Sequence, residues 1–231
     1  MRERLRFAVV SPHLDDAILS LGAGIMGAVR GADEVSVVTV FAGDPESRAP
    51  AGRWDARAGF RTEGEAAGAR RDEDRRACEL VGARCVWLPF GDDQYADGRD
   101  EDEVWSRVAE AVEPADLVLL PGGPLIHPDH LWVARVASER GLRPEAGLYR
   151  ELPYDLWPDA EKRRHTALSP PRQTARWIAP RVPLRLRLAK WHASGAYSSQ
   201  LRWLGRGWGF RRALLRSRVG GERVAWPDGS A

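Results

Sequence analysis

The sequence predicts an α/β fold in which helices cover both faces of a mostly parallel sheet. Short apolar runs rich in Val, Leu and Ile alternate along the chain with longer runs whose apolar residues recur at helical spacing. Strands that are buried on both faces have this near-continuous apolar character. The alternation is typical of Rossmann-like sheets. No apolar run approaches the ~20 residues needed to cross a bilayer, so the composition is that of a globular protein.

Each element is predicted from its own pattern. The run EVSVVTVF is rich in β-branched residues, as a buried strand should be. Residues 47–60 are rich in Gly, Pro, Arg and Trp, and we expect a long loop there. Strands are expected over residues 7–10, 34–41, 84–88, 116–120 and 147–152, and helices over residues 15–30, 63–82, 101–112 and 129–140.

The C-terminal part of the chain differs sharply in charge. Residues 1–160 contain 19 Arg and Lys against 30 Asp and Glu, whereas residues 161–231 contain 16 against 3. We therefore expect an α/β core over 1–160 and an Arg- and Trp-rich extension over 161–231. This extension either binds an anionic partner, such as substrate phosphates, a membrane surface or nucleic acid, or packs on the acidic core. One amphipathic helix is expected over 184–204, and residues 220–231 are expected to be loose.

Three glycines match a dinucleotide-binding fingerprint in the wrong place. Gly22, Gly24 and Gly27 fit the pattern G-x-G-x-x-G. That fingerprint works in the tight turn directly after the first strand, where a helix N-terminus meets pyrophosphate. Here the glycines fall inside a predicted helix. We interpret them as packing residues that let this helix lie close to the sheet.

Polar side chains crowd two turns that directly follow predicted strands. The first turn is SPHLDD at residues 11–16, and the second is HPDH at residues 127–130. Three of the five histidines lie in these two turns. Helix capping explains one carboxylate of the first turn but does not explain His13. Because ligands bind beyond the carboxyl ends of parallel strands, we expect the two turns to meet at one edge of the sheet.

Together the two turns have the composition of a catalytic metal site. Zinc in such a site typically takes three protein ligands, drawn from His, Cys, Asp and Glu, plus a water. Two histidines and one aspartate would supply the protein ligands and leave a carboxylate to accept a proton from the activated water. We expect Zn²⁺, with Fe²⁺ as the alternative ion.

The same turns resemble those of the PIG-L/LmbE-like zinc-dependent N-deacetylases. That family carries P-H-x-D-D after its first strand and H-x-D-H after a later one. RRDE at 70–73 resembles the family's R-x-x-E helix, and FGDD at 90–93 resembles a family loop in which Asp93 replaces a glycine. The stretch 190–201 is similar to the family's closing helix with its Ser-Gln. The resemblance covers residues 5–155.

The resemblance implies a role for each of the polar residues. His13, Asp16 and His130 would ligate zinc, and Asp15 would be the general base. His127 would stabilise the oxyanion, and Asp129 would orient His127 and tune its pKa. Arg70 and Asp92 would bind sugar hydroxyls or a phosphate of the substrate.

The activity expected from this resemblance is that of a zinc-dependent amidohydrolase. It would remove the acetyl group from an N-acetylglucosamine-type sugar conjugate, which could be phosphorylated or lipid-linked. No nucleic-acid partner is expected for this activity. Cys78 and Cys85 are too few for a disulfide framework, so we expect a cytoplasmic location. The alternative is a nucleic-acid or anionic-membrane binding module, in which the basic extension binds the ligand and the polar turns are structural.

Overall fold

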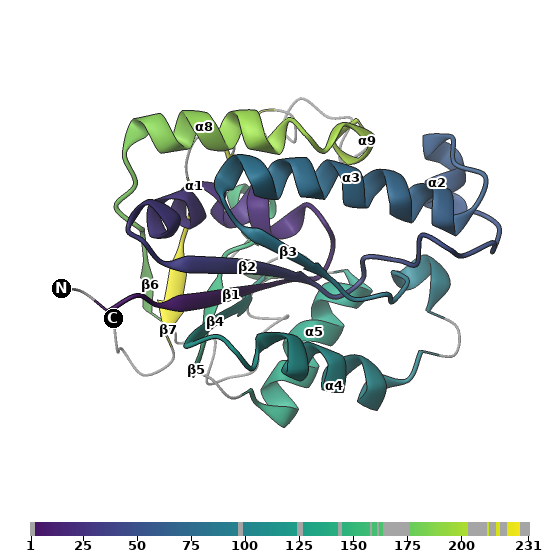
Figure 1. The fold of residues 1–231 in the computed structure, drawn as a ribbon, viewed down its shortest axis with the longest axis horizontal. Helices are drawn as coiled ribbons and strands as arrows, with labels where there is room; N and C mark the ends of the chain where they lie inside the picture. The colour runs from purple at the N-terminus through teal and green to yellow at the C-terminus, as the bar shows by residue number, and fades with distance from the viewer. Residues whose placement is uncertain are drawn as a thin grey trace.

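One seven-stranded sheet organises the chain. The computed structural model describes residues 3–96, 99–123, 127–142, 145–157, 159–160, 162–163, 176–202, 212, 216–217 and 221–226. Within these residues the strand order is β3-β2-β1-β4-β5-β7-β6. Helices cover both faces of the sheet, with α1, α3 and α8 on one side and α4 and α5 on the other (Figure 1). The predicted α/β architecture is confirmed, and no described helix is long and apolar enough to span a membrane.

Five neighbouring parallel strands make up most of the sheet, and all five were predicted. Each pairs with its neighbours in parallel. In the central strand, Val9 aligns with Val37 on one side and Leu119 on the other. Because helices bury both faces, these strands have apolar runs without polar alternation. The strands are β1 (Arg6–Ser11), β2 (Glu34–Thr39), β3 (Arg84–Trp87), β4 (Leu117–Pro121) and β5 (Glu145–Tyr149).

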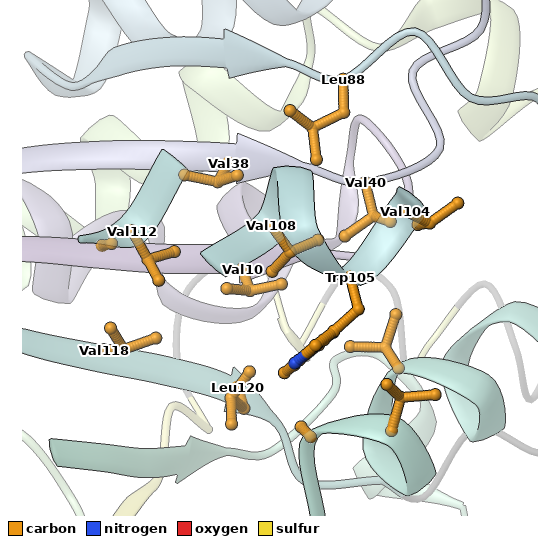
Figure 2. Close-up of a cluster of buried hydrophobic side chains, with 14 of the residues drawn as sticks. Val10, Val38, Val40, Leu88, Val104, Trp105, Val108, Val112, Val118 and Leu120 are labelled. Atoms are coloured by element: carbon orange, nitrogen blue, oxygen red, sulfur yellow. The ribbon is translucent and has the colours of Figure 1, made fainter. Parts of the chain in front are cut away.

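The helices α4 and α5 each bury one apolar face against the sheet, whereas α1 is buried over most of its surface. Figure 2 shows Trp105 and Val108 beside strand residues such as Val10. Burying each such side chain fully contributes about 1.5–3 kcal/mol, which fixes the helix on the sheet. The predicted helices are confirmed as α1 (Asp16–Arg30), α3 (Glu63–Val81), α4 (Glu101–Val112) and α5 (Pro128–Arg140).

A short helix, α2 (Arg53–Ala58), lies where a loop was predicted. Its N-cap residue is Gly52, which has no side chain to cap the helix. The cap comes from a distant loop instead: the Oε1 atom of Gln94 accepts hydrogen bonds from the backbone N–H groups of Trp54 and Asp55, at 2.5 and 3.3 Å. A helix this short is unstable alone, so it depends on tertiary contacts such as this one.

The basic extension adds two antiparallel strands to the sheet. The strand β7 (Val224–Trp226) pairs with β5 (Glu145–Tyr149), and β6 (Arg176–Ile178) pairs with β7. The prediction that residues 220–231 are loose is therefore wrong for 224–226, while 220 and 227–231 lie outside the described residues. A run of three residues is too short for its sequence pattern to predict a strand. The strand β7 forms because the edge of β5 is available for pairing.

The single helix predicted over 184–204 is instead two helices, α8 (Leu184–Ser194) and α9 (Ser198–Leu201). Contacts with α3 hold the junction between them. The hydroxyl of Tyr197 donates to the buried Asp74 carboxylate at 2.7 Å, and the Glu73 carboxylate accepts from both Ser198 and Ser199. These bonds satisfy the buried Glu73 carboxylate and add a second strong donor to Asp74, which also accepts from the Trp87 indole at 2.7 Å.

Gly22 and Gly24 of the false fingerprint face the extension and not the sheet, whereas a Cβ atom on Gly27 would meet no atom within 4 Å. A Cβ atom on Gly22 would lie 3.1 Å from Lys190 Cγ, and one on Gly24 would lie 3.1 Å from Glu222 Oε2. Lys190 Nζ and Glu222 Oε1 form a buried ion pair at 2.8 Å. The Glu222 carboxylate also accepts from the backbone N–H groups of Ala23 and Gly24. The interpretation that these glycines serve close packing on the sheet was wrong, because they admit this ion pair.

Breaking this ion pair should destabilise the fold. Lys190→Met leaves the buried Glu222 carboxylate without its cation, and we expect a loss of about 3–5 kcal/mol in urea unfolding. The exposed Arg185→Met on the same helix should change stability by less than about 0.5 kcal/mol. Adding Glu222→Gln to Lys190→Met should recover part of the loss, because it removes the unpaired charge. Equal stabilities for Lys190→Met and Arg185→Met would contradict this account.

Candidate metal centre and active site

The two polar turns meet at the carboxyl edge of the sheet. The first follows β1 and leads into α1, and the second leads into α5, which packs beside the adjacent strand β4. The ring centroid of His13 lies 5.0 Å from those of both His127 and His130. Residues more than a hundred positions apart therefore share one site, as the order of the parallel strands requires.

Three of the predicted site residues form a tight triangle of ligand atoms. His13 Nδ1 lies 3.5 Å from Asp16 Oδ2 and 3.2 Å from His130 Nε2. Asp16 Oδ2 lies 3.2 Å from His130 Nε2. Tetrahedral zinc with bonds of ~2.0–2.2 Å separates its ligand atoms by about 3.3–3.6 Å. The triangle has the size of one face of such a tetrahedron.

A wider set of side chains could also hold a metal ion. Ligand atoms of His13, His127 and His130 lie within 4.8 Å of one another, as do those of Asp93, His127 and Asp129. Both of these groups include His127, which is the N-cap residue of α5 and a third exposed. The triangle with Asp16 is tighter and more deeply buried, so it matches a small tetrahedral ion better.

Each histidine of the triangle has a carboxylate on its other ring nitrogen. His13 Nε2 lies 2.9 Å from Asp129 Oδ2, and His130 Nδ1 contacts Glu151 Oε1. Such carboxylates fix the ring orientation and tautomer of metal-binding histidines. Glu151 was missed by the sequence analysis. Its one signal was its position two residues after a strand, β5, that neighbours β4 in the sheet.

Asp129 lies against His13, whereas the sequence led us to expect it to orient His127. Its Oδ2 atom is 3.9 Å from His127 Nδ1, which is beyond hydrogen-bond distance. It also accepts from Arg99 and from the backbone N–H of Asp93, both at 2.9 Å. Burial opposes its ionisation, but the hydrogen bond from His13 and the contact with Arg99 lower the pKa of Asp129 to about 2. Arg99 gave no signal in the sequence.

The two adjacent aspartates of the first turn have opposite pKa shifts. Burial and the neighbouring Asp16 charge raise the pKa of Asp15 to about 7. Burial acts on Asp16 too, but the protonated imidazole of His130 more than offsets it and lowers the pKa of Asp16. Environments that separate the pKa values of neighbouring carboxylates in this way are typical of acid–base sites.

A cavity of about 480 Å³ opens above these residues. Arg70 and Asp92, the two predicted substrate-binding residues, both lie in its wall. The Arg70 guanidinium is held by the buried Asp55, and Asp92 caps a 3-10 turn by accepting from Gln94 N–H at 3.0 Å. The other residues that line the cavity are His13, Leu14, Asp15, Asp16, Phe41, Arg53, Trp54, Arg57, Asp93, Gln94, His127, Tyr154 and Gln200.

Two nitrogen donors at the cavity have no hydrogen-bond partner among the described residues. They are Nε of Arg70 and Nε2 of Gln200, and both are buried. Unpaired buried donors are rare in folded proteins, so these two are candidates for hydrogen bonds with a ligand in the cavity. Gln200 lies on α9 in the extension, so the extension supplies part of the cavity wall. The Ser-Gln pair at 199–200 was the sequence signal for it.

The fold and this cluster define an α/β protein with a candidate metal centre at the edge of its sheet. The family model "PIG-L: GlcNAc-PI de-N-acetylase" matches residues 8–140, which is more than half of the chain. The chain therefore belongs to the PIG-L family, and the resemblance of its two turns is confirmed. The search of curated proteins gave no match.

Solved structures of deacetylases share this fold over nearly the whole chain. The A40926 pseudoaglycone deacetylase Dbv21 is 30% identical, with 97% of both chains covered and a TM-score of 0.72. The zinc-inhibited form of the teicoplanin deacetylase Orf2 is 23% identical over 96% of this chain and 97% of its own, with a TM-score of 0.74. The N,N'-diacetylchitobiose deacetylase from Pyrococcus horikoshii is 18% identical over 97% and 85%, with a TM-score of 0.60.

The carboxylate behind His130 should tune metal affinity. Glu151→Gln keeps the shape of the side chain but removes its charge, and we expect zinc to bind about 10–100-fold more weakly. Competition with a chelator measures this directly. The exposed Glu113→Gln is the matched control and should bind zinc like the unmodified protein. Unchanged affinity in a folded Glu151→Gln variant would contradict the assignment.

Proposed function

We propose that this PIG-L family protein is a zinc-dependent N-deacetylase that hydrolyses the acetamide of an N-acetylglucosamine-type sugar conjugate and releases acetate and a free amine. Family membership supports the reaction. The proposal rests on one observation above all: His13, Asp16 and His130 converge on a point beside a cavity that Asp15 lines. Helix capping alone does not require these side chains to converge.

His13, Asp16 and His130 would hold the metal ion. Two imidazole nitrogens and one carboxylate oxygen are a donor set that suits zinc, and Fe²⁺ is the alternative. Zinc, when bound, supplies a Lewis acid and lowers the pKa of a water molecule. The contacts of Asp129 and Glu151 keep the two imidazoles aimed at the ion, so little reorganisation is needed when it binds.

Asp15 is the candidate general base. Its pKa of about 7 gives it the proton affinity that a base needs at neutral pH, whereas an ordinary aspartate would be too weak. It is buried yet borders the cavity, so it can take a proton from the attacking water and later return one to the leaving amine. Its neighbour Asp16 is committed to the two histidines, which separates the roles of the two carboxylates.

His127 is the candidate oxyanion stabiliser. Its Nδ1 atom accepts the backbone N–H of Asp129 at 3.3 Å, so the neutral ring carries its proton on Nε2. Burial and the charges of His13 and His130 lower the pKa of His127, which favours this neutral form. A neutral imidazole at the cavity wall can donate a hydrogen bond from Nε2 to developing negative charge.

The cavity is suited to a sugar. Its volume is in the range of small-molecule sites, and the aromatic rings of Phe41, Trp54 and Tyr154 lie in its wall among charged and polar side chains. The free donors of Arg70 and Gln200, with the carboxylate of Asp92, would bind sugar hydroxyls. The similar structures include deacetylases of teicoplanin and of N,N'-diacetylchitobiose, which supports a sugar-bearing substrate.

Substituting the two aspartates of the first turn should impair two different properties, turnover and zinc binding. Asp15→Asn should lower turnover by about 10²–10⁴-fold while zinc stays bound, because only the base is lost. Asp16→Asn should lose zinc itself. Acetate release and elemental analysis of the purified protein measure the two effects. The exposed Asp102→Asn serves as control, and full activity in Asp15→Asn would exclude it as the base.

Gln200 should act on substrate binding and not on the chemical step. Acetate release should first be screened across free, nucleotide-linked, lipid-linked and glycosidic N-acetylglucosamine to find a substrate. With that substrate, Gln200→Ala should raise KM by about 3–10-fold at nearly constant kcat, since one hydrogen bond to a neutral group is lost. A fall in kcat with no change in KM would assign Gln200 another role.

A further inference from the structure

The outer face of α8 carries a stripe of exposed apolar side chains. Leu184 and Leu188 are 67% and 56% exposed, more than any other large apolar side chain that the structure describes, and Trp191 is 37% exposed. At 3.6 residues per turn these three positions fall in one line along the helix. The opposite face, with Leu186 and Ala193, is buried where α8 packs on α1 and α3. Internal packing therefore leaves most of the surface of the two leucines uncovered, and part of the surface of Trp191.

Arginines flank this stripe on both sides. At about 100° per residue, Arg185 lies on one side of the line through the leucines and Arg187 on the other. Both are exposed, as is Arg181 just before the helix. The sequence has no Asp or Glu between Glu161 and Glu222, so no acidic residue of this segment neutralises them.

We propose that α8 docks this protein on an anionic lipid bilayer. A helix lying in the plane of the interface inserts leucine and tryptophan at the boundary of headgroups and acyl chains, while arginines on its flanks reach the lipid phosphates. The line of Leu184, Leu188 and Trp191 between Arg185 and Arg187 has this arrangement on the outward face of a helix anchored to the core. The cation of Lys190 points inward to Glu222 and takes no part.

The other partners fit this face less well. Nucleic acid would engage the arginines but would leave two exposed leucines in water. A second copy of the chain packed on the same face would bring arginines against arginines, which costs free energy. A bilayer with anionic headgroups is complementary to both the apolar stripe and the charges.

Docking through α8 would hold the candidate site close to the lipid surface. The helix α9 follows α8 after three residues, and its Gln200 lines the cavity. Figure 1 shows α8 and α9 along the same side of the molecule, above α3. The docking surface shares no residue with the proposed metal centre, so it can be tested without measuring turnover.

Co-sedimentation of the full chain with vesicles tests this proposal. Binding should be strong to phosphatidylcholine vesicles that contain phosphatidylglycerol and weak to phosphatidylcholine alone. Arg185→Gln with Arg187→Gln should weaken binding by about 25-fold, since each arginine near the surface contributes about five-fold. Leu184→Ser with Leu188→Ser should weaken it by about ten-fold or more, because two inserted side chains are lost.

Matched controls lie on other helices. Arg107→Gln with Arg135→Gln removes the same charge from α4 and α5, on the opposite face of the sheet, and Leu80→Ser removes an exposed leucine from α3. Both controls should bind vesicles like the unmodified chain, and circular dichroism should show every variant folded. Absence of binding to the anionic vesicles would overturn the proposal. So would normal binding by the leucine variant, which would show that the apolar stripe does not insert into the bilayer.

Discussion

The rest of the site depends on the contacts between two imidazole rings and the carboxylates at their outer ring nitrogens. His13 offers one nitrogen to the centre because Asp129 occupies the other, and His130 does so because of Glu151. The groups of this arrangement come from segments at the ends of β1, β4 and β5, which are neighbours in that order in the sheet. The strand order therefore determines which histidine is aligned by which carboxylate.

The acid–base chemistry of the first turn arises because two carboxylates are buried there and only one of them lies between the imidazoles. Asp15 and Asp16 are adjacent and equally buried, yet only Asp16 lies between the two imidazoles. The desolvation that raises the pKa of Asp15 is offset in Asp16 by its positive neighbours. One turn thus provides both a ligand that stays ionised and a base that can hold a proton near neutral pH. Moving either carboxylate by one residue would remove this difference.

The basic extension is part of the same structural unit as the sheet and the cavity. It contributes the last two strands, it covers α1 and α3 with α8, and it places Gln200 in the cavity wall. A buried ion pair between Lys190 and Glu222 ties it to α1, and the glycines of α1 leave the space for that pair. Part of its charge, which suggested an anionic partner in the sequence, lies in this internal contact, and part lies on the outward face of α8.

The sequence by itself determined the parallel strands, the four long helices and the two polar turns, because each is encoded in a local pattern of apolar spacing or in a short motif. Tertiary structure alone decided the features whose partners are far apart in the chain. The helix α2 depends on Gln94 as its cap, β7 depends on the edge of β5, and the contacts of Glu151 and Arg99 depend on the strand order. In each case the stabilising group lies tens of residues from the segment that it stabilises, and the order of the strands brings the two together. No local pattern can record such a contact, because the free energy that decides it is gained only when the chain folds.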